Sequence, residues 1–188
     1  MAAASSSGKI TLGYWNLRGG PRGNVARYML AYGGADWNEK TYTLGQEEWK
    51  NDKGTVMDFA NLPYIIDGDF KLSETFAVHN YIAQKYCPEL IGTTPQEKAR
   101  CHQLQRLAND QFIPFLLMCM KGEGDRAEAL SKCIDGLDVV GKLLKDGRFY
   151  LMGSKPCVAD FVLMSHIDFA VHLTDQTFTT YPHLEAFY

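Results

Sequence analysis

The pattern of apolar residues changes character near residue 90, and this change constrains the fold more than any other feature. Before it, short apolar runs of strand length alternate with runs whose apolar residues recur at helical spacing. After it, the strand pattern fades and helical spacing remains. A chain of 188 residues can form one compact body or two small modules. The sequence therefore predicts an α/β module followed by an all-α module.

The first half predicts a strand, a helix, a second strand and a short helix, in that order. Residues 9–14 have the pattern of a strand, and residues 23–32 have apolar positions at helical spacing. Residues 37–44 predict a second strand, which completes a βαβ unit. The polar segment 47–52 follows as the short helix.

A β-hairpin and a further helix complete this module. Apolar residues at 63–66 and 70–72 flank Asp67-Gly68, a dipeptide that favours a tight turn because the turn needs positive φ. Ser73 is expected to cap a helix that runs to about Cys87. The resulting order of elements is that of a thioredoxin-like module.

The second half predicts three helices. Thr94-Pro95-Gln96-Glu97 forms a capping box with proline at the first helical position, and Pro114 is expected to kink the helix that it begins. Further helices are expected over 125–146 and from 158 to about 173. The expected organisation is a loose tail (1–8), a thioredoxin-like domain (9–87), a linker (88–93) and a helical domain (94–188).

Composition excludes several classes of function. Nineteen basic residues face 22 acidic ones without a basic run, so neither nucleic acid nor an anionic membrane is expected as a partner. The start does not resemble a secretory signal, and no stretch is long enough to span a membrane. Five cysteines form no C-x-x-C pair, which indicates reduced thiols in a cytoplasmic protein and gives no support for a metal site.

Two motifs in the first half carry a family resemblance. The run Gly13-Tyr14-Trp15-Asn16-Leu17-Arg18-Gly19 and the segment Asp58-Phe59-Ala60-Asn61-Leu62-Pro63-Tyr64-Ile65-Ile66-Asp67-Gly68 resemble those of cytosolic glutathione transferases, most like the mu class. The helical second half fits the same family. The resemblance implies a homodimer that conjugates glutathione, as co-substrate and without a cofactor, to small hydrophobic electrophiles.

In such an enzyme Tyr14 would make the glutathione thiol nucleophilic. A thiol with a pKa of about 8.5 is mostly protonated at neutral pH. A phenol that donates a hydrogen bond to the thiolate lowers this pKa, and a shift of two units requires about 2.7 kcal/mol. Tyr14 would be a donor and not a base, because a phenol pKa near 10 keeps it protonated. Without the resemblance, Tyr14 would be interpreted as a strand-end aromatic.

The resemblance assigns roles to further residues by position. Pro63 matches a cis-proline that exposes the main chain of Leu62 to the cysteine of glutathione. Glu74 and Thr75 match an acid-or-amide and hydroxyl pair for the γ-glutamyl group, helped by a helix dipole. The remaining glutathione contacts would be Trp15, Trp49, Lys53, Asn61 and, from the neighbouring subunit, Asp110. Phe59 matches an aromatic residue that enters a pocket of the partner subunit.

The sequence also departs from the family pattern. An arginine usual shortly before Trp49 is replaced by Gln46-Glu47-Glu48, so glutathione affinity could be lower. Cys157 stands where serine or threonine usually caps a helix, and a thiol is a weak acceptor.

The electrophile pocket is expected to be apolar. Leu17, Gly20 and Met120 would line it, Met120 replacing a tyrosine that assists some electrophiles. The chain stops at Tyr188, before further structure of the family, so we expect a truncated chain or an open pocket. Two alternatives stay open: a sigma-like glutathione-dependent prostaglandin isomerase, and a non-catalytic relative that binds glutathione or other ligands.

Overall fold

A computed structural model describes residues 9–17, 20–122, 124–144 and 146–174, together with 184 and 187. The chain forms two compact units, Met1–Pro88 and Glu89–Tyr188, which are described separately. The expected tail at 1–8 lies outside the described residues.

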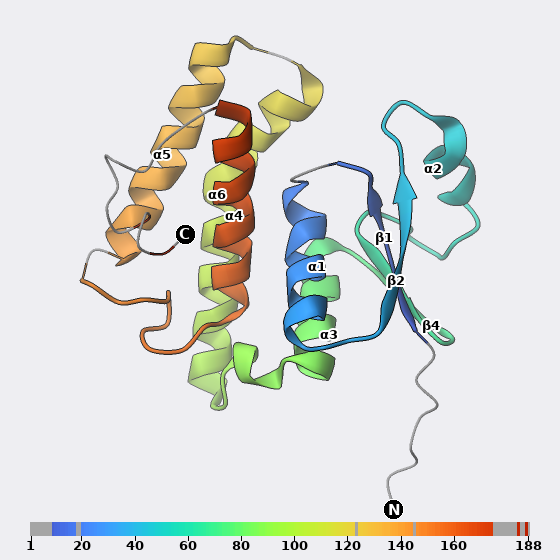
Figure 1. The fold of residues 1–188 in the computed structure, drawn as a ribbon, viewed down its shortest axis with the longest axis horizontal. Helices are drawn as coiled ribbons and strands as arrows, with labels where there is room; N and C mark the ends of the chain where they lie inside the picture. The colour runs from blue at the N-terminus through green and yellow to red at the C-terminus, as the bar shows by residue number, and fades with distance from the viewer. Residues whose placement is uncertain are drawn as a thin grey trace, which may run out of the picture. The chain divides into compact units, whose positions relative to one another are not determined.

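A four-stranded mixed sheet forms the centre of the first unit (Figure 1). Its strands are β1 (Ile10–Trp15), β2 (Trp37–Tyr42), β3 (Tyr64–Asp67) and β4 (Phe70–Ser73), in the order β2-β1-β3-β4. The helix α1 (Pro21–Tyr32) connects β1 to β2, and these strands run parallel because a crossover helix joins them. The strand β3 is antiparallel to β1 and to β4. The predicted thioredoxin-like order of elements is confirmed.

Helices cover both faces of this sheet. The helices α1 and α3 (Thr75–Tyr86) pack against each other. Gly23 of α1 lies against Tyr14 of β1, whereas Trp49 of α2 (Glu47–Asp52) contacts Trp15, the next residue of the strand. Adjacent strand residues point to opposite faces, so α1 and α2 lie on opposite sides of the sheet.

The hairpin forms as predicted, but its turn is shifted by one residue. Asp67 is still paired, opposite Phe70, so the loop consists of Gly68 and Asp69. Gly68 has φ 60° at the first loop position, which suits a two-residue turn with glycine there.

Ser73 does not cap α3, so that prediction is wrong. It is the last residue of β4, paired with Tyr64, and its hydroxyl donates a hydrogen bond of 2.7 Å to the carbonyl of Phe59. Because the strand pairing and this hydrogen bond engage Ser73, the next residue, Glu74, occupies the N-cap with φ 74°.

The second unit is helical, as predicted. A 3-10 turn (Pro88–Ile91) begins at the last residue of the first unit. The second unit contains the helices α4 (Pro95–Lys121), α5 (Arg126–Leu144) and α6 (Val158–Thr174). The helix α4 packs against both of the others. Among the helices of the described residues, none has the length and apolar character needed to cross a bilayer.

Two sequence signals in α4 have the expected structural effect. The hydroxyl of Thr94 accepts a hydrogen bond from the Glu97 N–H at 3.2 Å, and the Glu97 carboxylate accepts one from the Thr94 N–H at 2.9 Å, which completes the capping box. Pro114 lies inside the helix, whose direction changes towards its C-terminal end in Figure 1.

Candidate functional site

Tyr14 lies where the sheet meets the start of α1. It is the next-to-last residue of β1, which extends one residue beyond the prediction, and only 6% of its surface is exposed. A Cβ added to Gly23 would stand 2.0 Å from Cδ1 of the Tyr14 ring, and one added to Gly20 would stand 2.9 Å from Cε1. These two glycines therefore allow α1 to begin directly on the tyrosine ring.

The surroundings of Tyr14 keep its hydroxyl protonated at neutral pH. Burial raises the pKa of Tyr14 above its usual value of 10. The positive charge of Arg22 and the backbone N–H groups of Gly23 and Arg22 oppose this rise without reversing it. A protonated hydroxyl next to positive charge and N–H groups can donate a hydrogen bond to an anion.

Two arginines of α1 surround this tyrosine. The Arg27 guanidinium lies 5.7 Å from the centroid of the Tyr14 ring, donates to Asn24 Oδ1 at 2.6 Å, and forms an ion pair with Glu39. Arg22 is different, because its Nε is buried without a hydrogen-bond partner among the described residues.

Sequence reasoning missed Arg22, although a signal was available. A cation in the first turn of a helix is disfavoured by the helix dipole, and the first turn of α1 carries no acidic residue. A basic residue in such an unfavourable place suggests a role with anions.

An aromatic cluster brings Trp15 and Trp49 together on the opposite face of the sheet. Their ring centroids are 6.3 Å apart, and Trp49 also stacks on Tyr64 at 6.2 Å. Tyr42 lies 5.1 Å from Trp49, donates to Asp52 at 3.0 Å, and shares a hydrogen bond of 2.8 Å with the Tyr64 hydroxyl. These contacts hold the short helix α2 on the sheet and fix the position of Trp49.

Among the described lysines near Trp49, two are in ion pairs. Lys40 pairs with Glu48, and Lys50 pairs with Glu47 at 3.1 Å, so both acids that replace the expected arginine are neutralised. The Lys53 ammonium forms no ion pair with any residue that the structure describes. Lys53 is therefore available to bind a carboxylate.

Asn61 connects the segment before β3 to the start of α3. Its Nδ2 donates to Glu74 Oε1 at 3.0 Å, and its Oδ1 accepts from the Leu62 N–H at 2.9 Å. The Leu62-Pro63 peptide bond is cis, as the resemblance implies. Because Asn61 takes up the Leu62 N–H, the expected pairing of Leu62 with a bound peptide requires this side chain to turn.

The start of α3 is suited to an anion. The Glu74 side chain makes no capping hydrogen bond to the helix, and Thr75 is its first residue. The first N–H groups of a helix have no partner within it and lie at the positive end of its dipole. A carboxylate could therefore bind at Thr75, and the exposed Glu74 carboxylate lies beside this helix start.

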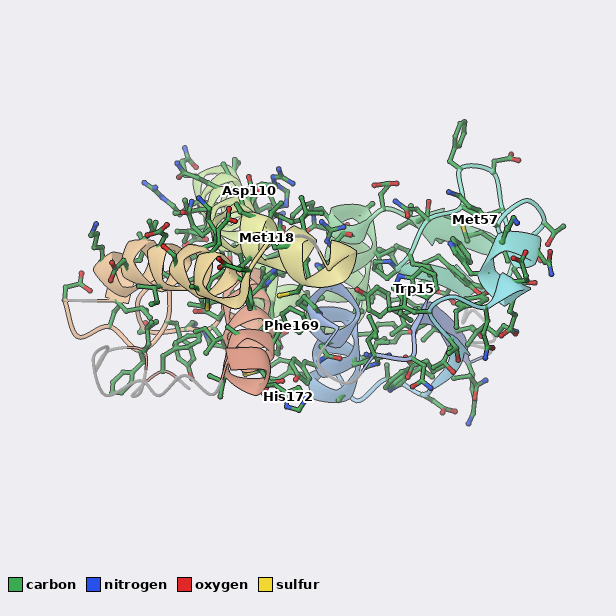
Figure 2. All side chains as sticks on the ribbon, turned by 90° about the horizontal axis from the view of Figure 1, so that it is seen from above. Trp15, Met57, Asp110, Met118, Phe169 and His172 are labelled. Carbon is green, nitrogen blue, oxygen red and sulfur yellow. The ribbon has the colours of Figure 1, made fainter. Side chains whose placement is uncertain are left out.

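The other expected site residues lie at separate places. Leu17 is half-buried and Gly20 is buried, on either side of Arg18 and Gly19, which lie outside the described residues. Asp110 is on α4 of the helical unit, where it pairs with Arg106 at 3.1 Å (Figure 2). Met120 is also in α4, but its side chain lies outside the described part of the structure.

Phe59 is an exposed aromatic residue in a left-handed conformation. Its exposed fraction is 93% and its φ is 56°. Phe59 borders a cavity of about 690 Å³, which Val56, Met57 and Phe70 also line. Phe59 is therefore a candidate for a contact with another molecule.

Sequence-family models match both halves of the chain. Sequence models described as "Glutathione S-transferase, N-terminal domain" and "Glutathione S-transferase, C-terminal domain" match residues 10–84 and 110–188. The chain is 33% identical to a class-mu 26 kDa glutathione S-transferase isozyme of Fasciola hepatica, over 94% of this chain and 80% of the relative. It is 29% identical to Glutathione S-transferase Mu 4 of Mus musculus, over 95% and 84%.

The fold is also found among solved structures. A glutathione S-transferase of Necator americanus, described as monomeric, superposes with a TM-score of 0.78 at 23% identity, over 96% of this chain and 89% of that one. At this identity the likeness concerns the fold.

Proposed function

We propose that this chain, which belongs to the glutathione S-transferase family and is similar to its mu class, uses the Tyr14 hydroxyl to stabilise the thiolate of glutathione. The thiolate then attacks a small hydrophobic electrophile, and glutathione becomes covalently attached through its sulfur. The carbon–sulfur bond forms as the leaving group departs, or as the electrophile's double bond accepts the electron pair.

The observation that carries this proposal is the environment of Tyr14. The Tyr14 side chain is buried, and its hydroxyl is protonated at neutral pH with the charge of Arg22 and two backbone N–H groups beside it. A hydrogen bond to a charged group contributes about 1.5 to 3 kcal/mol. This is enough to lower the pKa of a thiol by about one to two units.

The rest of glutathione would be held along β1, α2 and the start of α3. Trp15, Trp49 and Lys53 would contact the glycine end, with Lys53 binding its carboxylate. Thr75 and the N-terminus of α3 would bind the γ-glutamyl carboxylate, and Glu74 would face the neighbouring ammonium group. Asn61, Leu62 and Pro63 would bind the central cysteine, and Asp110 would act from a partner subunit.

Two further parts of the proposal concern the assembly and the pocket. The exposure of Phe59 supports a homodimer in which this side chain enters the partner. Leu17, Gly20 and Met120 would give the electrophile an apolar surface. The family also suggests that the protein works in the cytoplasm.

The pH dependence of conjugation tests the role of Tyr14. We would measure the rate with glutathione and chlorodinitrobenzene for the wild type and for Tyr14→Phe, which keeps the ring. At neutral pH we expect a loss of roughly 10- to 150-fold in kcat/KM, the equivalent of 1.5 to 3 kcal/mol. The loss should shrink as the pH approaches the pKa of free thiol. A phenylalanine variant with the wild-type profile would refute the assignment.

A further inference from the structure

The start of α1 packs on Tyr14 without the help of a side-chain cap. A Cβ added to Gly20 would stand 2.9 Å from the Tyr14 ring and one added to Gly23 would stand 2.0 Å from it, so both glycines lie directly on the ring. Gly20 is the N-cap and has no side chain to accept the first N–H groups, and Pro21 at the first helical position has no N–H. This helix start therefore depends on contacts with other elements for its position.

His79 of α3 makes such a contact. Its Nε2 lies 2.8 Å from the backbone carbonyl oxygen of Arg22, the second residue of α1. A carbonyl oxygen only accepts hydrogen bonds, so Nε2 carries a proton and donates it. The oxygen has two lone pairs and can accept this bond together with one from the helix. The bond joins two helices that pack against each other, at the end of α1 that meets Tyr14.

The imidazole of His79 lies where an apolar side chain would pack well. Only 1% of His79 is exposed, and Val78 and Ile82 of the same helix are fully buried. The ring of Phe76, one turn earlier, meets the imidazole edge-on with the centroids 6.4 Å apart. Burying a polar group costs free energy unless it is hydrogen-bonded. What His79 adds to this place is therefore its hydrogen bond to Arg22.

This hydrogen bond reaches the Tyr14 ring through one peptide group. The Arg22 carbonyl, the Gly23 N–H and the Gly23 Cα belong to the same planar unit. The Gly23 Cα is the atom whose added Cβ would stand 2.0 Å from the ring carbon Cδ1 of Tyr14. A change in the orientation of the Arg22 carbonyl therefore moves the atom against which the ring packs.

The side chain of Arg22 is placed by the same peptide group. Its Nε is buried without a hydrogen-bond partner among the described residues, so this nitrogen does not hold the helix start. The positive charge of Arg22 acts on Tyr14. The packing and the charge around Tyr14 thus both depend on the backbone that His79 contacts.

We propose that His79 is a positioning residue for Tyr14, because its Nε2–H holds the Arg22 carbonyl and so keeps the first turn of α1 against the tyrosine ring. The inference rests on the proposed function of Tyr14 and extends it to a buried residue of α3. Loss of the donor should let the ring shift and should weaken its hydrogen bond to the glutathione thiolate.

Nitrogen NMR of the wild-type protein tests the hydrogen bond directly. The chemical shift of a histidine ring nitrogen shows whether that nitrogen carries a proton, and the signals of His79 are identified by their absence from His79→Gln. We expect Nε2 of His79 to be protonated at neutral pH. An Nε2 without a proton would overturn the proposal.

The pH dependence of conjugation tests the effect on Tyr14. His79→Leu removes the donor at similar volume, whereas the amide of His79→Gln can place an N–H near the position of Nε2. With saturating glutathione, kcat/KM for chlorodinitrobenzene follows the ionisation of the bound thiol. We expect His79→Leu to shift this profile to higher pH and to lower kcat/KM at neutral pH roughly 3- to 10-fold, as for the loss of one hydrogen bond, and His79→Gln to stay within about twofold of the wild type.

Two further variants serve as controls. Ile82→Val changes another fully buried residue of α3 and should lower the thermal unfolding midpoint without moving the pH profile. In a Tyr14→Phe background, His79→Leu should cause no further shift of the profile, because His79 acts through Tyr14. Circular dichroism would verify the fold of each variant, and His79→Met, which also lacks the donor, replaces His79→Leu if that variant is unfolded.

The outcomes separate this inference from the proposed function. A wild-type profile with the pKa of free glutathione would overturn both. A lowered wild-type pKa that His79→Leu leaves unchanged would overturn only the role of His79. Equal losses in His79→Leu and His79→Gln, an equal shift in Ile82→Val, or a further shift in the Tyr14→Phe background would overturn it as well.

Discussion

Gly23 supports the ring of Tyr14 so closely that a Cβ at position 23 would stand 2.0 Å from the ring carbon Cδ1. A contact below 3 Å cannot be accommodated unless the ring or the helix moves. Because the same ring carries the hydroxyl that we assign to the thiolate, the position of Tyr14 depends on the absence of a side chain at Gly23.

Gly23→Ala is therefore expected to impair catalysis by displacing Tyr14. Overpacking costs about 1 to 3 kcal/mol, which outweighs the gain of about 1 kcal/mol from the helix preference of alanine. We expect kcat/KM for conjugation to fall at least tenfold. The matched control is Gly141→Ala in α5, where a Cβ meets nothing within 4 Å and stability should stay equal or rise. Wild-type activity in Gly23→Ala would contradict the expectation that catalysis depends on the close contact between Gly23 and the Tyr14 ring.

Glu74→Gln tests the assignment of Glu74 to the ammonium group of glutathione. The amide oxygen can still accept the hydrogen bond from Asn61, so the substitution removes the charge and little else. We expect KM for glutathione to rise roughly 3- to 10-fold, by analogy with the loss of an exposed or partly exposed charge interaction, with little change in kcat.

A modified substrate provides the control for Glu74. A glutathione analogue without the α-amino group should have the same KM with the wild type and with Glu74→Gln. If the substitution raises KM for this analogue as much as KM for glutathione, the Glu74 carboxylate does not act on the α-amino group.

Phe59→Ala is expected to convert a dimer to a monomer. Sedimentation velocity should give the mass of a dimer for the wild type and that of a single chain for the variant. Alanine lacks the ring that would fill the pocket of the partner. Phe149 is 73% exposed in the helical unit, so Phe149→Ala is a suitable control and should stay dimeric. A wild type that sediments as a monomer would refute the homodimer.

The ion pair between Asp67 and Lys85 predicts a pH-dependent contribution to stability. Burial would raise the pKa of Asp67, but hydrogen bonds from Lys85 and Tyr81 hold it below its usual value. A carboxyl group with a lowered pKa stabilises the fold above the unfolded-state pKa of about 3.9, and this contribution is lost as the pH falls through the folded-state pKa.

Asp67→Asn should consequently lower the free energy of unfolding by about 1.5 to 3 kcal/mol at pH 7, as judged by urea denaturation. The difference from the wild type should shrink below about pH 4. Asp36 pairs with Lys9 on the surface, where the side chains are 73% and 52% exposed, and Asp36→Asn should change little. An equal effect of both substitutions would mean that the partners of Asp67 contribute nothing specific.

The fold could be predicted from local patterns because each element carries its own signal. The capping box at Thr94 and Glu97 set the start of α4 correctly, since two hydrogen bonds specify that residue. Ser73 is a position where the local pattern gave the wrong prediction. A serine before a helical run suggests a cap, but its hydroxyl is used by Phe59, a contact that no local pattern reveals.

The residues of the candidate site were predicted mainly from the family resemblance. The contacts that hold these residues in place were predicted only in part. The positions of Tyr14 and Trp49 follow from the motifs, yet the supports around them are long-range. The contact of Trp49 with Tyr42 and Tyr64 joins three separate elements, and the hydrogen bond of Asn61 to Leu62 depends on a side-chain orientation. Arg22 was missed because its importance depends on its proximity to Tyr14 in space.

A direct titration of the glutathione thiol in the binary complex tests whether Tyr14 lowers the pKa of this thiol. Thiolate absorbance of bound glutathione would be recorded against pH for the wild type and for Tyr14→Phe. We expect a thiol pKa below about 8.5 with the wild type and a pKa near that of a free thiol with the variant. Equal pKa values in the two complexes, with glutathione bound to both, would contradict it.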